Sequence, residues 1–334
     1  MAQESWVSHM LIISSDSPAF RIIYMLSIGF LLLTHANEAQ VLRLTGALNQ
    51  LFDEPPIVCH HDFSRAQFNT THFSSNVRFA RPHLKTSWGT ISLVHAMLQA
   101  LRTLYEKDAP DWFYFLSGSD YPIRDRDAII AELSHSPFDA YIRLKKIDHR
   151  EIPKRIVDDT GGLESASYMR LAYQRYIGRS LPIPSWRHPH RGPAAMHLHL
   201  LNPKLLKPFH PFSDDYFCYA GDQWFAANSR SAKSLLAPET DRLLNYFTGR
   251  FPPDEAVCPT ILGNASDLKI SPESKHYIRW DKGHHPRLLE ESDLPAMLSS
   301  GAHFARKFAP ESTPLDRIDE HLGLEHSRRT QLRA

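Results

Sequence analysis

The chain has 334 residues, of which 42% are hydrophobic and 22% charged, and its formal net charge is +1. This composition is close to the average for soluble globular proteins, supplies material for a large core, and gives no electrostatic reason to expect a nucleic acid partner. The three cysteines are odd in number, lie far apart and form no CxxC pair, which argues against a zinc ribbon and against a disulfide framework.

An apolar stretch near the N-terminus is interpreted as a buried first strand. Only about a dozen residues separate Arg21 from Thr34, whereas a membrane-spanning helix needs roughly 20. The upstream acids Glu4 and Asp16 do not resemble the basic region of a signal peptide. A short membrane anchor stays open as the alternative. Residues 1–24 are interpreted as an N-terminal extension, which is either absent from the native protein or part of such an anchor.

Strand-like and helix-like segments then alternate along the chain. Continuous apolar runs predict strands at residues 27–33, 57–60, 77–79 and 112–116. Apolar residues at helical spacing predict a helix over 41–51 and another that starts near Thr86 or Ser87 and runs to about residue 105. Asp125 is expected to cap a helix that ends near Leu133. In the second half we expect strands at 196–200, 219–228 and 277–280, and helices near 232–247, 254–262 and 293–299.

This alternation predicts an α/β fold with a Rossmann-like, mostly parallel central sheet and helices on both faces. Ligands bind at the carboxyl ends of the strands in such sheets. Polar residues that follow the strands should therefore line one rim: His35, Asn37, His61, Asp62, Ser117 and Asp120. No GxGxxG motif is present, so NAD is not expected. The segment 145–195 is interpreted as long loops over the site.

Four short blocks carry a family resemblance: FYFLSGSDYPIRDRDAI at 113–129, GDQWF at 221–225, PDE at 253–255 and GAHFARKF at 301–308. In this order they resemble the core-2/I-branching β-1,6-N-acetylglucosaminyltransferase and peptide O-xylosyltransferase family (glycosyltransferase family 14), in a bacterial-type member. The likeness runs from about residue 27 to 322. It implies one GT-A-like glycosyltransferase domain over 25–322, with a donor half at about 25–145, an acceptor and catalytic half at about 195–322, and a charged tail at 323–334.

The resemblance implies transfer of a sugar from a UDP donor with inversion of configuration. Such a reaction needs a carboxylate that takes the proton from the acceptor hydroxyl. The match places this base on Glu255, with Asp254 as the second candidate. Acidic residues also favour the first turn of a helix, so a purely structural role for both is the alternative.

The resemblance also implies that basic side chains, and no metal ion, neutralise the UDP diphosphate. Lys307 and Arg287 match these roles, while Arg306 is a neighbouring candidate and Arg279 a weaker one. Residues 125–127 spell the Asp-x-Asp pair of metal-dependent enzymes, but their place at a predicted helix start indicates a cap. The many histidines, including pairs at 60–61 and 284–285, show no metal-ligand spacing.

The remaining candidates divide between the donor rim and the acceptor side. His35, Asp62, Ser117 and Asp120 are expected at the donor rim, with a capped turn as the alternative for Ser117 and for Asp120. Trp88 is also placed there, either stacked on a base or sugar or anchoring the core. Gly221 and Trp224 are expected on the acceptor side, where a glycine allows close backbone approach.

The predicted function is that of an inverting glycosyltransferase, with UDP-N-acetylglucosamine and UDP-xylose as leading donors and a glucuronosyl donor left open. The acceptor is expected to be a glycan or lipid-linked saccharide. Few cysteines and no Golgi-type anchor favour the cytoplasm, with a peripheral place at the inner face of the membrane left open. A catalytically silent UDP-sugar-binding protein and a histidine-rich metallohydrolase are the alternatives.

Overall fold

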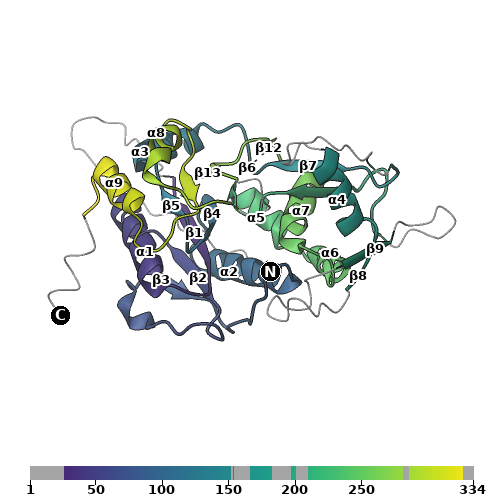
Figure 1. Cartoon of the computed structure of the whole chain (residues 1–334), viewed down its shortest axis with the longest axis horizontal. Helices are drawn as coiled ribbons and strands as arrows, with labels where there is room; N and C mark the ends of the chain where they lie inside the picture. The colour runs from purple at the N-terminus through teal and green to yellow at the C-terminus, as the bar shows by residue number, and fades with distance from the viewer. Residues whose placement is uncertain are drawn as a thin grey trace, which may run out of the picture.

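A seven-stranded sheet forms the centre of the computed structural model, which describes residues 26–151, 153, 166–182, 197–200, 210–280 and 286–325 (Figure 1). Its strand order is β12-β6-β11-β4-β1-β2-β3. The strands span Ile28–Thr34 (β1), Ile57–His61 (β2), Val77–Phe79 (β3), Trp112–Ser117 (β4), Ala140–Tyr141 (β6), Ala226–Asn228 (β11) and Ile270–Ser271 (β12). Neighbours run parallel except at β11, which is antiparallel to both β4 and β6.

The central strand β1 shows why the sheet forms. Every residue of its IGFLLLT sequence is buried, as expected of a parallel strand covered on both faces. Leu31 pairs with Val58 of β2 and with Phe115 of β4. The apolar stretch therefore forms a core strand as predicted, and no helix within the described ranges is long and apolar enough to span a membrane.

Helices cover both faces of this sheet, and α1 (Glu38–Phe52) and α2 (Ile91–Lys107) flank the central strands from opposite sides (Figure 1). Leu44 of α1 shares one hydrophobic cluster with Phe30 of β1, whereas Leu101 of α2 shares the other with Leu31. Successive residues of a strand point to opposite faces, so β1 anchors both clusters. The predicted α/β class, with a mostly parallel central sheet between helices, is confirmed.

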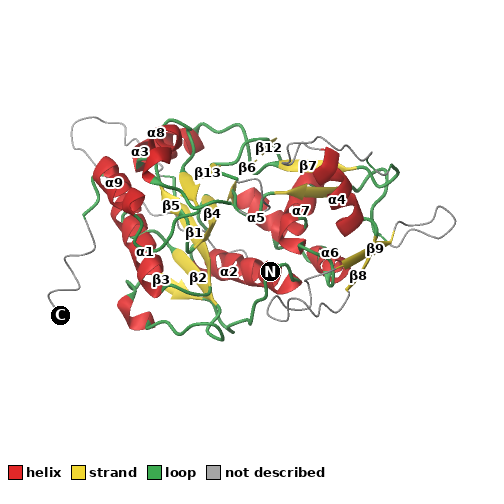
Figure 2. Ribbon diagram, in the orientation of Figure 1, coloured by secondary structure: helices red, strands yellow, loops and turns green. Residues whose placement is uncertain are grey.

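The remaining helices lie on two sides of the molecule: those between residues 166 and 264 gather on the side away from α1, whereas those at 126–134, 294–298 and 313–322 lie on the side of α1 (Figure 2). The helices are α3 (Arg126–Ser134), α4 (Ala166–Tyr176), α5 (Ser229–Leu235), α6 (Thr240–Phe247), α7 (Val257–Asn264), α8 (Leu294–Leu298) and α9 (Thr313–Leu322), with 3-10 turns η1 (Thr70–His72), η3 (Pro253–Glu255) and η4 (Glu291–Asp293). The smaller sheets pair β7 (Leu144–Ile147) with β10 (Cys218–Gly221), β8 (Arg179–Pro182) with β9 (His197–Leu200), and β13 (His276–Ile278) with β14 (Phe304–Arg306) and β5 (Tyr121–Pro122).

Three expectations about the second half were wrong. The described part of 145–195 is not all loop, because it contains most of β7, all of α4 and β8. The strand predicted over 219–228 is two strands in different sheets, since the chain turns between β10 and β11. The helix predicted over 232–247 is likewise two, because Pro238 lies in the break between α5 and α6. Residues 1–24, the histidine pair at 284–285 and the tail from 326 lie outside the described residues.

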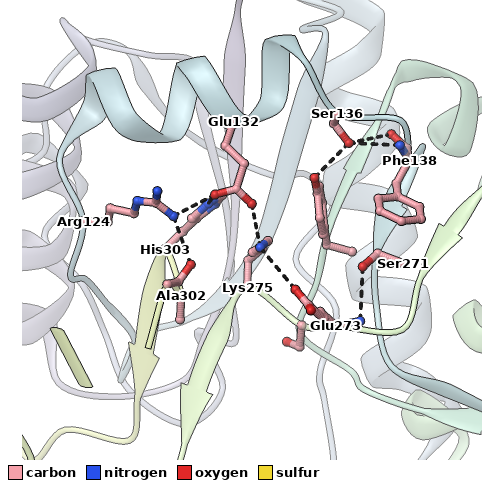
Figure 3. A network of polar contacts seen from close by, with 12 residues as sticks. Arg124, Glu132, Ser136, Phe138, Ser271, Glu273, Lys275, Ala302 and His303 are labelled. Carbon is pink, nitrogen blue, oxygen red and sulfur yellow. Dashed lines mark hydrogen bonds and ion pairs between the residues drawn. The ribbon is translucent and has the colours of Figure 1, made fainter. Parts of the chain in front are cut away.

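Three basic side chains surround the carboxylate of Glu132 on α3 (Figure 3). Lys275 Nζ lies 2.6 Å from Oε1, and Arg124 and His303 lie 2.7 and 3.1 Å from Oε2. The hydrogen bond from His303, reinforced by that from Lys275 and opposed by burial, lowers the pKa of Glu132 to about 2. Because His303 directly precedes β14, this network fixes the start of the strand that ends at Arg306.

Glu132→Gln tests this network. A carboxyl with a lowered pKa in the folded state contributes stability that is present above its unfolded pKa and is lost as pH falls through the folded value. We expect Glu132→Gln to lower the free energy of unfolding by about 2–3 kcal/mol at pH 7. Between about pH 4.5 and about pH 2 this difference from the parent should shrink.

Urea unfolding at several pH values measures both quantities. Glu106→Gln, at an exposed position of α2, is the control and should differ little from the parent at any pH. A deficit in Glu132→Gln that is equal at pH 7 and pH 3 would show that the charge of Glu132 does not stabilise the fold.

Candidate active site

The turn after β4 holds Asp120 at the carboxyl end of the sheet. The Asp120 side chain accepts hydrogen bonds from the Ser117 backbone N–H (2.8 Å) and hydroxyl (2.7 Å). Asp120 is only 2% exposed. Ser117 therefore forms a capped turn, which was the alternative given for it, and Asp120 lies beneath the rim.

Arg306 reaches Asp120 from β14. Its Nε lies 3.1 Å from Asp120 Oδ1, close enough for an ion pair although not aligned for a hydrogen bond. On its other side the guanidinium lies 4.7 Å from the ring centroid of Trp224, within cation–π range. Burial raises the pKa of Asp120 and Arg306 opposes that rise. The predicted diphosphate candidate Arg306 is thus held between an acid and an indole.

Trp224 belongs to the turn between β10 and β11, which Asp222 fixes. Arg143 holds Asp222 by two side-chain hydrogen bonds of 2.9 Å each. A Cβ on Gly221 would lie 2.4 Å from the Arg143 carbonyl oxygen. The close approach that Gly221 permits is therefore made by the protein's own backbone, where β10 lies against β7.

Two carboxyl groups follow the Pro252-Pro253 pair on η3. Asp254 is 4% exposed, and burial raises its pKa to about 6. Glu255 is half-buried; burial and then the charge of Asp254 raise the pKa of Glu255 to about 7, while Arg175 opposes the rise. The charge of Asp222 also raises this pKa, so Glu255 lies within electrostatic reach of the turn that carries Trp224.

Trp88 lies beside the same η3 segment. It is 59% exposed, so it is not a core anchor, and its ring meets Phe251 edge-on with centroids 4.9 Å apart. The next residue, Gly89, has φ +70°, and a Cβ there would lie 1.9 Å from the Phe251 ring. The structure thus places Trp88 against the residue that leads into Pro252 and Glu255.

The donor-rim candidates His35 and Asp62 lie near the diphosphate candidate Lys307. Burial, followed by the charges of Arg65 and Lys307, lowers the pKa of His35. Asp62 is buried and accepts hydrogen bonds from Ser64 and Thr86; these outweigh burial and lower the pKa of Asp62 to about 2. Asp62 therefore anchors the loop that leads to Trp88.

Lys307 is exposed, and backbone hydrogen bonds fix its position. Its carbonyl accepts from Leu289 N–H (2.9 Å), and the next residue, Phe308, donates to the Ser119 carbonyl (3.0 Å). No described side chain forms an ion pair with Lys307.

The other basic candidate, Arg287, pairs with Asp293 and also donates to the Leu288 carbonyl (3.1 Å). Its backbone N–H donates to the carbonyl of the exposed Arg279 (2.9 Å). The two predicted diphosphate residues therefore lie on adjoining segments, but Arg287 is already engaged.

Structural roles account for the other polar candidates. Asp125 caps α3 by accepting from Ala128 N–H (2.9 Å), as predicted. His60 Nε2 accepts from Leu84 N–H, and His61 bonds the Thr34 hydroxyl and the Ala66 carbonyl. Among the described residues, no group of three or more His, Cys, Asp and Glu could hold a metal ion.

Sequence reasoning missed Arg143, Tyr168 and Arg175 near the site. Tyr168 and Arg175 come from the segment 145–195 that was interpreted as loops, and Arg143 lies just before it. They belong to no recognisable motif, and only the folded chain brings them to Asp222 and Glu255.

The site lies at the carboxyl ends of the parallel strands and combines buried carboxyls, exposed basic groups and an exposed indole. Residues 28–160 match the family model described as Core-2/I-Branching enzyme. This stretch thus matches the Core-2/I-branching enzyme family, in agreement with the resemblance found in the sequence.

Named relatives agree with this assignment. The chain is 29% identical to the β-glucuronosyltransferase GlcAT14A of Arabidopsis thaliana over 72% of its length and 26% identical to GlcAT14B over 89%. It spans 49% and 63% of those two proteins. A 62-residue stretch is 44% identical to human xylosyltransferase 1, covering 18% of this chain and 6% of that protein. The structure of core-mannan synthase A from Aspergillus fumigatus aligns over 97% of this chain and 93% of that one at 10% identity, but the TM-score of 0.31 is too low to bear on fold or function.

Asp120→Asn tests the buried ion pair. The variant keeps the shape of the side chain but leaves the charge of Arg306 uncompensated, which typically costs 3–5 kcal/mol when both partners are buried. We expect the free energy of unfolding to fall by about 3 kcal/mol in urea titrations. Asp125→Asn, the same change at an exposed cap where asparagine serves equally well, is the control. Equal stability of the two variants would mean that the ion pair does not stabilise the protein.

Proposed function

We propose that the protein is an inverting glycosyltransferase with a GT-A-like fold that transfers a sugar from a UDP donor to a hydroxyl group of a glycan or lipid-linked saccharide. Glu255 is the general base, basic side chains neutralise the diphosphate, and no metal ion is required. The half-buried Glu255 carboxyl, with its pKa raised to about 7, is the observation that carries this proposal.

The chemistry of general base catalysis favours Glu255 over Asp254. A base works best when its pKa lies near the working pH, because it must be ionised before transfer and must hold a proton afterwards. Glu255 meets this condition at neutral pH and is partly exposed. Asp254 is more deeply buried, so its oxygens are less accessible to an acceptor hydroxyl.

We assign the neutralisation of the leaving group, UDP, to Lys307. An exposed ammonium on a fixed backbone can bind a phosphate as a compact point charge, and it stabilises the negative charge that develops on UDP. Arg306 adds positive charge behind Trp224. Arg287 would have to share its guanidinium with Asp293, so we give it the lesser part.

The comparisons widen the choice of donor. The likeness to the two β-glucuronosyltransferases covers most of this chain, whereas that to xylosyltransferase 1 covers 18%. UDP-glucuronic acid, which the sequence left open, is therefore tested on equal terms with UDP-N-acetylglucosamine and UDP-xylose.

UDP release from this donor panel, with and without EDTA, is the direct test. We expect release from one donor to be insensitive to EDTA and to fall about 10²- to 10⁴-fold in kcat in Glu255→Gln, because a general base contributes that much. Glu106→Gln should retain the parent rate. Loss of activity with EDTA would overturn metal independence, and an active Glu255→Gln would overturn the choice of base. Tight UDP binding without release from any donor would instead favour the silent UDP-sugar-binding protein.

Lys307→Ala tests the diphosphate site. Loss of a charge-assisted contact to phosphate should lower kcat/KM for the donor by about 10- to 100-fold. UDP affinity, measured by calorimetry, should fall in parallel. Lys233→Ala, at an exposed position of α5, is the matched control. Unchanged UDP affinity in Lys307→Ala would exclude Lys307 from the donor site.

A further inference from the structure

Helix α4 lies against the segment that carries the two carboxyl groups of η3. The Tyr176 hydroxyl donates to the Pro252 carbonyl (2.8 Å), and the Tyr246 hydroxyl donates to the Tyr176 carbonyl (2.5 Å). Tyr176 is fully buried. The end of α4 is therefore fixed directly to the residues that precede Asp254 and Glu255.

Tyr168 lies about two helical turns before Tyr176, on the same broad face of α4. Its hydroxyl lies 3.5 Å from Glu255 Oε2, at the long end of the hydrogen-bond range. Hydrogen bonds at catalytic groups are often this long before a substrate binds. Of the hydrogen bonds formed between described residues, this is the one that reaches the Glu255 carboxylate.

The phenol can act only as a donor in this contact. Burial, followed by the charge of Glu255, raises the pKa of Tyr168, so the hydroxyl keeps its proton throughout the working range. An ionised carboxylate is acceptor-only, whereas a protonated one is not. The contact therefore favours the ionised form of Glu255, which is the form that a general base needs.

Some of the other charges around Glu255 raise its pKa and others lower it. Asp254 on η3 and Asp222 in the turn after β10 raise its pKa, while Arg175 on α4 lowers it. Arg143 holds Asp222, and Arg175 also lies 5.6 Å from the centroid of the Phe251 ring. Tyr168, on the helix that is fixed to Pro252, thus opposes the effect of these two acidic residues on the pKa of Glu255.

We propose that Tyr168 is a positioning residue for Glu255. The Tyr168 hydroxyl orients the Glu255 carboxylate and sets the pH at which Glu255 becomes an effective base. This inference rests on the proposed role of Glu255 in transfer. It assigns a function in catalysis to α4, which lies outside the residues matched by the family model.

Tyr168→Phe removes only the hydroxyl. If the apparent pKa of Glu255 rises by about one unit, UDP release will be about tenfold slower than in the parent at pH 6 but within about twofold at pH 9. Tyr173→Phe is the matched control, because Tyr173 lies on the same helix and its hydroxyl makes a contact of similar length, 3.4 Å, to the His149 carbonyl. Its pH profile should superimpose on that of the parent.

A second measurement needs no turnover. The carboxyl carbon of Glu255 can be titrated by NMR in protein labelled with ¹³C-glutamate, with its signal assigned by its absence in Glu255→Gln. The midpoint should lie near pH 7 in the parent and about one unit higher in Tyr168→Phe.

The two measurements separate the two proposals. An unchanged midpoint, or a rate lowered equally at every pH, overturns the role of Tyr168. A raised midpoint in Tyr168→Phe, in a protein that releases no UDP from any donor, supports the role of Tyr168 and overturns the proposed transfer.

Discussion

The buried ion pair between Asp120 and Arg306 connects the two halves of the site. Asp120 follows the central strand β4, Arg306 ends β14, and the indole of Trp224 covers the guanidinium from the turn before β11. Removing either charge would leave the other uncompensated in a region of low polarity. Because Lys307 is the next residue along the chain, the same pair fixes where an exposed ammonium stands at the carboxyl rim of the sheet.

Burial raises the pKa of the carboxyl at both ends of this site, but the neighbouring charges differ. At Asp120 a full positive charge lies alongside, so the carboxyl is compensated and serves the structure. At Glu255 the charges of Asp254 and Asp222 reinforce the effect of burial, so the pKa rises to about 7 and the group gains the properties of a base. The different roles of Asp120 and Glu255 therefore follow from their surroundings. Helix α4 supplies Tyr168 and Arg175, which oppose the rise in the pKa of Glu255.

Periodicity and motif order predicted most of the first half correctly, because β1, β2, β3 and β4 are continuous apolar runs and α1 and α2 have regular apolar spacing. The four blocks also predicted the family. The missed features depend on tertiary contacts. Nothing in the local sequence shows that Gly221 ends one sheet before Asp222 turns the chain toward another, or that Arg306 pairs with Asp120. Helix α4 escaped notice because its buried residues, Ala172, Tyr173 and Tyr176, give only a sparse apolar pattern.

In the proposed reaction, the carboxyl rim of the sheet binds UDP so that the transferred sugar faces Glu255. A crystal structure of the protein with UDP tests it most directly. We expect diphosphate oxygens within hydrogen-bond distance of Lys307 Nζ, with the outer phosphate directed toward Trp224 and the η3 segment. UDP bound elsewhere, or a diphosphate that contacts neither Lys307 nor Arg306 and points away from Glu255, would contradict it.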